Sequence, residues 1–502
     1  MGQAGLLGRL EALVDASGAA PWLEARLPVG ARARQLSVRS LLLGVALAFA
    51  DGRPAHLTRA LEALSGLGED DRWRLGALAD WHGAPHPLSY RQVWWTAQLV
   101  LGVLAKNCPD GAPSKEARQF LAAIVGASAP RWAAALSSSL AVDWTDLESW
   151  ACPPLGKGGP SADPEASWGH RRGDGPGQED ELYWGYYLSL GTMVKEEGGP
   201  EVPELVRVAT IGSCKLDPVP EMAGELEAYA RRGNAIGDVA ADCGYSHRVA
   251  PNWAHRLRAI GGRLVSDLHP DDRGPRGTHQ GATCCNGNLY CPATPPGLLS
   301  LGAPARGASQ QGLAAYDKKA EELARYKLGR VSSDDQDGYC RVACPAVLGK
   351  LRCPLRPASL SLPYDRPTVT SLPGHPPKCC TQKTITVPPS VNAKTAQRHD
   401  WGSAAWRASY ARRSAAERAN STIKDPATND VSKGWCRLMG LAPLVFFLAP
   451  LLAVRNLRVI DAFEARQAED ARRAVAGLAP KQRRRRRKGL RDLVAPSANA
   501  PP

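Results

Sequence analysis

The stretch Tyr410-Ala-Arg-Arg413-Ser-Ala-Ala-Glu417-Arg-Ala-Asn-Ser-Thr-Ile-Lys424 is the most informative part of this 502-residue sequence. Its functional residues follow the spacing Tyr, two residues, Arg, three residues, Glu, six residues, Lys. At about 100° per helical residue, these four positions and Trp406 fall within an arc of about 60°. Pro426 then limits the helix. The spacing predicts one helix that projects four polar side chains into a single groove, with a charged, solvated helix face as the alternative.

Two aspartates lie upstream, each directly after a short apolar segment. Asp143-Trp144-Thr145 follows Leu140-Ala141-Val142, and Asp242-Cys243-Gly244-Tyr245 follows Val239-Ala240-Ala241. Between them lie two β-like runs, at 182–194 and 205–211, and a helix-like stretch at 219–232. The order strand, strand, strand, helix, strand predicts an α/β fold with a mixed sheet. Taken singly, each aspartate is more readily explained as a turn residue at a strand end.

Together these features resemble the DDE family of bacterial insertion-sequence transposases, whose C-terminal signature is Tyr-(2)-Arg-(3)-Glu-(6)-Lys. The family's first acid stands in an Asp-X-Thr motif and its second in Asp-X-Gly-Tyr, and Asp143 and Asp242 match these. The stretch Asp163-Pro164-Glu165-Ala166-Ser167-Trp168-Gly169 also resembles one that is common in this family. The resemblance implies an RNase H-like catalytic domain in which Asp143, Asp242 and Glu417 are the catalytic residues.

The chemistry of these residue types agrees with that expectation. Cleavage of a phosphodiester requires an activated water or hydroxyl and relief of charge on the leaving oxygen, which two divalent ions about 4 Å apart supply. Carboxylates suit Mg²⁺, or Mn²⁺ in its place. Tyr410, Arg413, Lys424 and Trp406 are expected to bind DNA, Arg413 as a bidentate donor to phosphate and Lys424 as a point charge.

The expected function is therefore cut-and-paste DNA transposition by metal-dependent strand cleavage and transfer. The first alternative is a catalytically inactive, DNA-binding descendant of a transposase, and the second is a zinc-stabilised structural or RNA-binding protein. The expected partners are double-stranded DNA of the transposon ends and of the target, and the resemblance allows a homodimer in the synaptic complex.

Changes in composition divide the chain into five parts. Residues 1–135 are expected to be helical, for which a DNA-binding region and a plain helical bundle are equally good interpretations. The RNase H-like core is expected at 136–255 and 396–470 because Asp242 and Glu417 are 175 positions apart, which is too far for one crossover. A Cys-rich insertion is expected at 256–395. Residues 471–502 form a basic tail that is expected to be disordered.

The expected insertion contains eight of the 13 cysteines. They are Cys284, Cys285, Cys291, Cys340, Cys344, Cys353, Cys379 and Cys380, with His279 and His375 nearby. Cys340-X3-Cys344 resembles half a zinc site, which Cys353 or the Cys379-Cys380 pair would complete. Buried or free thiols are the alternative, because the spacing is not that of a standard zinc ribbon.

The net charge of +14 favours a polyanionic partner, with nucleic acid ahead of an anionic membrane. Seven of these charges come from Lys481, Arg483 to Arg487 and Lys488 in the tail. The N-terminus does not read as a signal peptide, so a cytoplasmic location and reduced cysteines are expected. The apolar run at 438–454 contains Pro443 and Pro450 and is expected to be a core helix rather than a membrane span.

Overall fold

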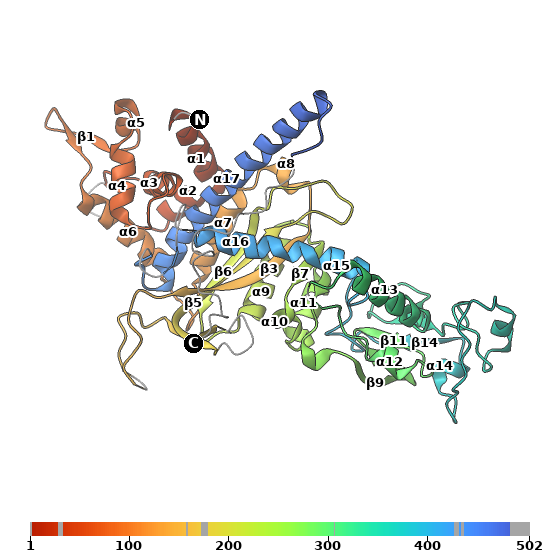
Figure 1. Ribbon diagram of the computed structural model, residues 1–502. Helices are drawn as coiled ribbons and strands as arrows, with labels where there is room; N and C mark the ends of the chain where they lie inside the picture. Colours follow the sequence, from red (N-terminus) through yellow and green to blue (C-terminus); the bar gives the residue numbers. More distant parts are fainter. Residues whose placement is uncertain are drawn as a thin grey trace, which may run out of the picture. The chain divides into compact units, whose positions relative to one another are not determined.

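The computed structural model describes residues 3–28, 34–156, 159–171, 179–305, 307–425, 431–432 and 436–481. Two compact units are found, residues 1–456 and 457–502. As predicted, the first 135 residues are mainly helical (Figure 1). Their helices are α1 (Gln3–Ser17), α2 (Ala19–Glu24), α3 (Val38–Ala50), α4 (Leu57–Ser65), α5 (Glu69–Arg74), α6 (Tyr90–Leu104), α7 (Lys115–Ala127) and α8 (Arg131–Ala134).

Serine side chains start three of these helices. Ser37 accepts a hydrogen bond from the backbone of Ser40 before α3, Ser114 does so from Ala117 before α7, and Ser89 forms a capping box with Gln92 before α6. Such caps satisfy backbone donors that the first helical turn leaves free. The exception to the helical prediction is an antiparallel hairpin of β1 (Leu78–Trp81) and β2 (Ala84–Pro87).

The centre of the larger unit is a six-stranded mixed sheet, so the predicted α/β class is confirmed at this level. Its strands are β3 (Leu140–Glu148), β4 (Ser167–Arg171), β5 (Glu181–Met193), β6 (Val206–Ser213), β7 (Asp238–Ala241) and β8 (Arg263–Ser266). β5 pairs antiparallel with β3, β4 and β6, whereas β3, β7 and β8 are parallel neighbours.

The first strand is longer than the sequence suggested. We expected it to end at Asp143, but β3 continues to Glu148, which pairs with Gly185 of β5. The parallel pairing with β7, by contrast, covers only Leu140 and Ala141. Asp143 therefore lies just beyond the end of the parallel ladder, while its strand remains held on the other edge.

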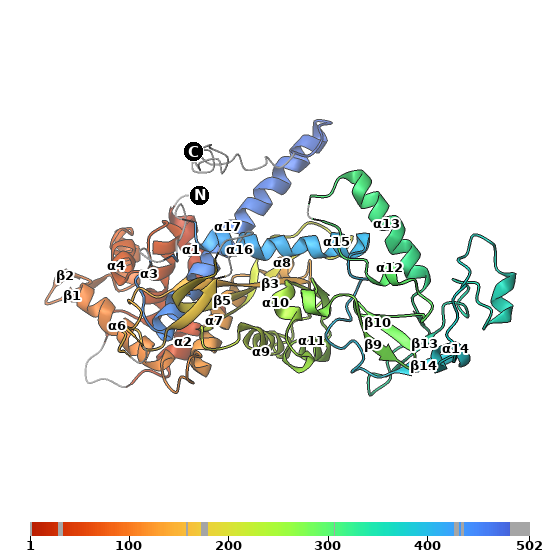
Figure 2. The same ribbon diagram turned by 60° about the horizontal axis from the view of Figure 1, so that its bottom comes forward.

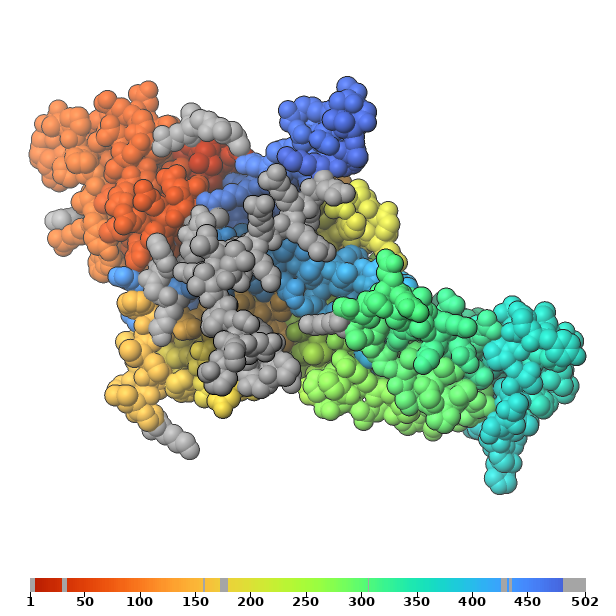
Figure 3. Space-filling view, viewed as in Figure 1, coloured from red at the N-terminus to blue at the C-terminus, as the bar shows by residue number. Residues whose placement is uncertain are grey.

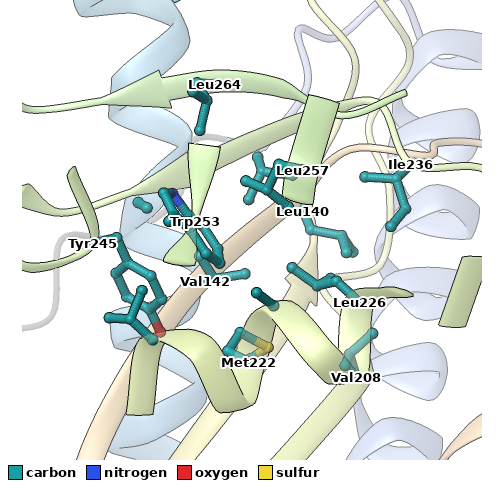
Figure 4. Packing of buried hydrophobic residues seen from close by; sticks show 14 of the residues in the cluster. Leu140, Val142, Val208, Met222, Leu226, Ile236, Tyr245, Trp253, Leu257 and Leu264 are labelled. Atoms are coloured by element: carbon teal, nitrogen blue, oxygen red, sulfur yellow. The ribbon is translucent and has the colours of Figure 1, made fainter. Parts of the chain in front are cut away.

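The sheet is covered on two faces, as Figures 1 and 2 show. On one face lie α9 (Pro218–Arg231), α10 (Cys243–Ser246), the 3₁₀ turn η1 (Ala250–Asn252) and α11 (Ala254–Ala259). Val142 and Val239 of the sheet pack there with Leu226 of α9 and Leu257 of α11, all fully buried (Figure 4). Side chains alternate along a strand, so the strand residues next to Val142 and Val239 in the sequence face the opposite side of the sheet.

That opposite face is covered by the predicted signature helix, which is not one continuous α-helix. It consists of α15 (Ala404–Tyr410), the 3₁₀ turn η4 (Ala411–Arg413) and α16 (Ser414–Ile423). Ala415 and Ala416 of α16 pack against Ala141, Ala240 and Val265 of the three parallel strands. Small residues on both sides let the helix backbone approach the sheet closely.

The Cys-rich region forms two small three-stranded antiparallel sheets, with β10 and β13 as their central strands. Its elements are β9 (Pro275–His279), β10 (Ala282–Cys285), β11 (Asn288–Tyr290), β12 (Gly329–Arg330), β13 (Cys340–Ala343), β14 (Thr384–Val387), α12 (Pro296–Leu299), α13 (Gln310–Arg325), α14 (Lys378–Thr381) and the 3₁₀ turns η2 (Pro270–Asp272) and η3 (Pro357–Ser361).

The last helix, α17 (Leu441–Val475), contains residues 441–454 of the apolar run and has Pro450 inside it. It is long and apolar enough to cross a membrane, but 78% of its most apolar window is buried inside the protein, as in a core helix. One such helix is weak evidence for a membrane protein. The predicted basic cluster from Arg483 to Lys488 lies outside the described residues.

Candidate active site

The register of the parallel strands places acidic residues side by side. Leu140 pairs with Val239 and Ala141 with Ala240, so two further steps bring Asp143 opposite Asp242. Ala241 pairs with Ser266 on the next strand, and one further step brings Asp242 opposite Asp267. Neighbouring strands are about 4.8 Å apart. Three aspartates therefore form a row, with Asp143 inside β3 just beyond its parallel pairing and with Asp242 and Asp267 directly after β7 and β8.

These aspartates face the helix that carries the other predicted site residues. Ala141, Ala240 and Val265 contact α16, and each precedes an aspartate of the row by two positions. Residues two apart on a strand share a face. The row therefore points toward α15 and α16, whose atoms reach the surface on the face seen in Figure 3.

Arg413 connects the helix to the acids. Its Nη1 lies 3.8 Å from Oδ2 of Asp143, and its Nη2 donates a hydrogen bond to Glu417 one turn later. The Arg413 guanidinium is largely covered, with a 15% exposed side chain, whereas the Glu417 side chain is 52% exposed. The positive charge of Arg413 also acts on Asp242. Arg413 thus contacts Asp143 and Glu417 and lies within electrostatic reach of Asp242.

Burial dominates the electrostatics of this group. Loss of solvent, followed by the negative charge of Asp242, raises the pKa of Asp143 to about 7, although Arg413 and the Trp144 amide act in the opposite direction. Burial also raises the pKa of Asp242, to which the charge of Asp267 contributes, against the lowering influence of Arg413. Two adjacent, poorly solvated carboxylates are stabilised by a nearby cation, because opposite charge favours their ionised form.

The Asp-X-Gly-Tyr motif owes its form to tight packing. Asp242 caps α10 by accepting a hydrogen bond from the amide of Gly244 at 2.9 Å. A Cβ atom on Gly244 would lie 2.5 Å from the ring of Trp144. The fully buried ring of Tyr245 lies 4.8 Å, between centroids, from that of Trp144. Glycine and tyrosine therefore fix the backbone that carries Asp242 against the strand that carries Asp143.

The remaining signature residues lie beside the acids with different exposures. The Tyr410 ring stacks on Trp406 at 4.7 Å and 9°, and burial raises the pKa of its phenol. Trp406 is only 5% exposed and donates from Nε1 to the Ser266 carbonyl, so its position suits support of Tyr410 rather than a DNA contact. Lys424 Nζ lies 3.1 Å from Asp146 of β3.

Two polar residues of this site were missed in the sequence. Asp267 accepts a hydrogen bond from Trp401 Nε1 at 2.9 Å and lies 3.4 Å from Arg273. Asn420 donates to Asp143 Oδ2 at 3.3 Å, and its own Oδ1 has no hydrogen-bond partner among the described residues. Asp267 had a detectable signal, because it follows the apolar Leu264-Val265 segment as Asp242 follows Val239-Ala240-Ala241.

The chemistry of the acids suits a hard divalent cation, since carboxylate oxygens are the ligands that Mg²⁺ prefers. The oxygens of Asp143, Asp242 and Glu417 are not yet close enough to share one ion. Among the described residues, the one group of three potential ligands within 4.8 Å of one another is His247, His269 and Asp271. Because the Glu417 side chain is exposed, its carboxylate has room to turn from Arg413 toward the aspartates.

The predicted zinc ligands are divided between two cores. Cys344 and Cys353 belong to one buried cluster, with Cys291. Cys340, on β13, packs against the other, which contains Cys379 and Cys380. Cys340 begins the four-residue strand β13 and Cys344 directly follows that strand, so at about 3.3 Å per residue their Cα atoms are about 13 Å apart. The sulfurs of Cys340, Cys344 and Cys353 do not all lie within 4.8 Å of one another.

The site thus combines buried carboxylates, a basic residue between them and a stacked aromatic pair on an accessible helix. This combination is able to hold cations and the phosphates that accompany them. Comparison with protein-family models, with curated proteins and with solved structures found no match to this chain.

Proposed function

We propose that this chain is a DDE-type DNA transposase that cleaves the ends of an insertion sequence and transfers them to target DNA. The observation that carries the proposal is the register of β3 and β7, which sets Asp143 opposite Asp242, with Glu417 linked to them through Arg413. These are the three acids that the sequence motifs single out independently.

The topology of the sheet supports an RNase H-like core. The neighbours in space are β6, β5, β3, β7 and β8, with antiparallel pairing among the first three and parallel pairing among the last three. In such a fold the catalytic acids come from the first and fourth strands and from a helix that follows the fifth. Among these five strands, which leave out β4, β3 is the first in the chain, β7 the fourth and β8 the fifth, so β3, β7 and α16 would correspond to those elements. Residues 267–403 separate β8 from α15, whereas the insertion was predicted at 256–395 and so included β8.

The residues fit two Mg²⁺ or Mn²⁺ ions. The pKa of Asp143 is raised to about 7 by burial and by Asp242, which means that both carboxylates lack a sufficient positive neighbour. The ions would be held by Asp143, Asp242 and Glu417. Asp267 lies next to Asp242, on the side away from Asp143. When bound, the ions supply an activated water or hydroxyl and offset the charge on the leaving oxygen.

The chain's own residues would bind and orient the DNA. Arg413 and Lys424 provide positive charge for phosphate oxygens, in exchange for their present contacts with Glu417 and Asp146. The raised pKa of Tyr410 keeps its phenol protonated as a hydrogen-bond donor. In hydrolysis, water would attack phosphorus and the P–O3′ bond would break, which leaves a 3′-hydroxyl and a 5′-phosphate. In transfer, the 3′ oxygen would lose its proton and bond to a target phosphorus while the P–O3′ bond of the target breaks and the target 3′ oxygen leaves as a hydroxyl. A reaction on chromosomal DNA implies a cytoplasmic, nucleoid-associated protein, and synapsis of two ends would suit a homodimer.

The test is cleavage of duplex DNA that carries the sequence flanking this coding region. Replacement of Asp143 or Asp242 by Asn, or of Glu417 by Gln, should reduce Mg²⁺-dependent cleavage by several orders of magnitude while DNA binding largely survives. The losses in double variants should not multiply, because the acids act as a unit. Glu62→Gln is the matched control, since Glu62 is a 56% exposed helical acid paired with Arg59. Full activity of Glu417→Gln would refute the proposal.

The same experiment separates the first alternative, an inactive DNA-binding descendant. That protein would bind flanking DNA but would show no Mg²⁺-dependent cleavage in the unsubstituted chain. The buried pair of aspartates favours the active enzyme, because two adjacent carboxylates with raised pKa values are a cost to folding that an inactive protein has no reason to keep.

A further inference from the structure

Cysteines from separate segments of the Cys-rich region are brought together by backbone pairing. The amide of Cys291 donates a hydrogen bond of 2.9 Å to the carbonyl of Tyr326. Tyr326 lies shortly before β12 in the sequence. β12 and β14 both pair with β13, through Gly329 and Thr384 opposite Ala343. Cys344 follows Ala343 directly, and Cys380 precedes Thr384 by four residues. Antiparallel pairing therefore brings Cys291, Cys344 and Cys380 to the same end of this sheet.

A fourth cysteine joins them by packing. Cys353 shares one buried cluster with Cys291 and Cys344, and all three are 5–7% exposed. Arg356, in the turn after Cys353, donates a hydrogen bond to the Gln382 carbonyl, two residues beyond Cys380. Cys380 is itself 7% exposed. Three of these buried thiols thus share one cluster, and Cys380, from the neighbouring cluster, lies at the same end of the sheet.

The surroundings of these sulfurs disfavour thiolates that have no cation to share. Burial is the largest influence that raises the pKa of Cys291, but Cys344, Cys380 and Cys353 each add to it, so these sulfurs lie within electrostatic reach of one another. Cys291 and Cys344 each begin a Cys-Pro-Ala turn. The amide of Ala293 donates to the Cys291 sulfur, and those of Ala346 and Val347 donate to the Cys344 sulfur. Such N–H bonds stabilise a thiolate or a metal-bound sulfur.

We propose that Cys291, Cys344, Cys353 and Cys380 bind one structural Zn²⁺ through four thiolates. Zinc prefers a closed tetrahedral set of sulfur ligands at about 2.3 Å in sites of this kind. Binding replaces each S–H bond by an S–Zn bond and releases the thiol protons to solvent. The positive charge of Arg356 acts on Cys344 and on Cys380, and so offsets part of the negative charge of a four-thiolate site.

The neighbouring cysteines have other roles. Cys379 lies beside Cys380, with 4.0 Å between the sulfurs, and its hydrogen bond lowers the pKa of Cys380. Cys285 donates to the Leu299 carbonyl, and Cys340 is half-buried on β13. In the part of the chain that the structure describes, no three cysteine sulfurs all lie within 4.8 Å of one another. Zinc would therefore draw the four ligands together and tighten the region.

The site is tested by metal analysis of the purified full-length protein. We expect about one zinc per chain in the unsubstituted protein, and loss of that zinc in Cys291→Ser, Cys344→Ser, Cys353→Ser and Cys380→Ser. Cys340→Ser and Cys284→Ser are matched controls, because both change a cysteine of the same region outside the ligand set, and they should keep the metal. Replacement of zinc by Co²⁺ should give the intense thiolate-to-metal absorption of a tetrahedral sulfur site.

Two further measurements keep the result unambiguous. If a serine variant fails to fold, Cys380→His offers zinc a nitrogen ligand in its place and should restore both soluble protein and bound metal. Well-folded protein without zinc would overturn the proposal, and so would a count of reacted thiols showing disulfides among these four cysteines. Loss of zinc in Cys340→Ser but not in Cys291→Ser would overturn the ligand set. None of these readouts depends on DNA cleavage, so this proposal and the proposed function fail separately.

Discussion

Asp143 is a proposed catalytic residue, and its ionised carboxylate is also unfavourable in the folded protein. Its ordinary pKa of 3.8 is raised to about 7 in the folded chain, chiefly by burial and next by Asp242. Without metal, the folded protein therefore binds this proton more tightly than the unfolded chain does. The stabilising effect of the bound proton is complete below about pH 4 and is lost as the pH rises to about 7.

Asp143→Asn should remove that dependence, because an amide does not ionise. In EDTA, the free energy of unfolding of the unsubstituted protein relative to the variant should fall by up to roughly 3 kcal/mol between pH 4.5 and pH 8. Urea unfolding at the two pH values measures the difference, with Glu62→Gln as a surface control. Parallel pH profiles of the unsubstituted protein and Asp143→Asn would contradict the raised pKa.

Asp267 is the residue whose role the structure added. It lies opposite Asp242 in the register of β7 and β8, and it accepts from Trp401. Asp267→Asn keeps an acceptor oxygen but removes the charge beside Asp242. If the proposed function is correct, it should raise the Mg²⁺ concentration for half-maximal cleavage by about 10- to 100-fold, as for residues that support metal ligands. An unchanged Mg²⁺ requirement would assign Asp267 a purely structural role.

At the scale of elements, the signature helix is fixed to the sheet by one buried acid. Asp238 at the start of β7 has a 1% exposed side chain and binds Arg263, Arg398 and Arg412. Of these, Arg412 in the turn η4 is the most buried, at 8%. This group aligns the junction of α15 and α16 with the strand that leads to Asp242.

Asp238→Ala should therefore destabilise the protein by about 3 to 5 kcal/mol, because it leaves buried arginine charge without its partner. Arg263→Ala is the comparison, since Arg263 is 52% exposed and an exposed pair is worth at most about 1 kcal/mol. Urea unfolding of both variants gives the two free energies. Equal losses would show that the Arg412 contact contributes no more than the exposed one.

The element scale also shows why the helix prediction was only partly correct. The Tyr410 to Lys424 spacing suits one α-helix, but the structure changes to a 3₁₀ turn over Ala411–Arg413. A 3₁₀ turn advances about 120° per residue instead of 100°, which alters the direction of the residues that follow. The turn lies where Arg412 bonds to Asp238, a partner 174 residues away in the sequence. No local pattern contains that contact.

At the scale of the whole molecule, the basic tail should add affinity for DNA without specificity. Residues 480–502 contain seven of the net positive charges, and each phosphate contact contributes about 0.9 to the slope of log K against log salt. Deletion of the tail should flatten that slope by up to about six and weaken binding to flanking and random DNA alike. Equilibrium binding at several salt concentrations measures it. A loss confined to flanking DNA would instead mean that the tail reads sequence.

The sequence by itself determined the features that depend on residue type and local spacing. It identified the helical N-terminal region, the mixed α/β class and the order of Asp143, Asp242 and Glu417, because apolar periodicity and short motifs are local properties. Only the tertiary structure decided which side chains meet. Strand register added Asp267 to the row of acids, and pairing of β12, β13 and β14 grouped Cys344 with Cys291 and Cys380 instead of Cys340. Register and packing join residues far apart in the chain, and the free energy that selects them comes from burial of the whole core.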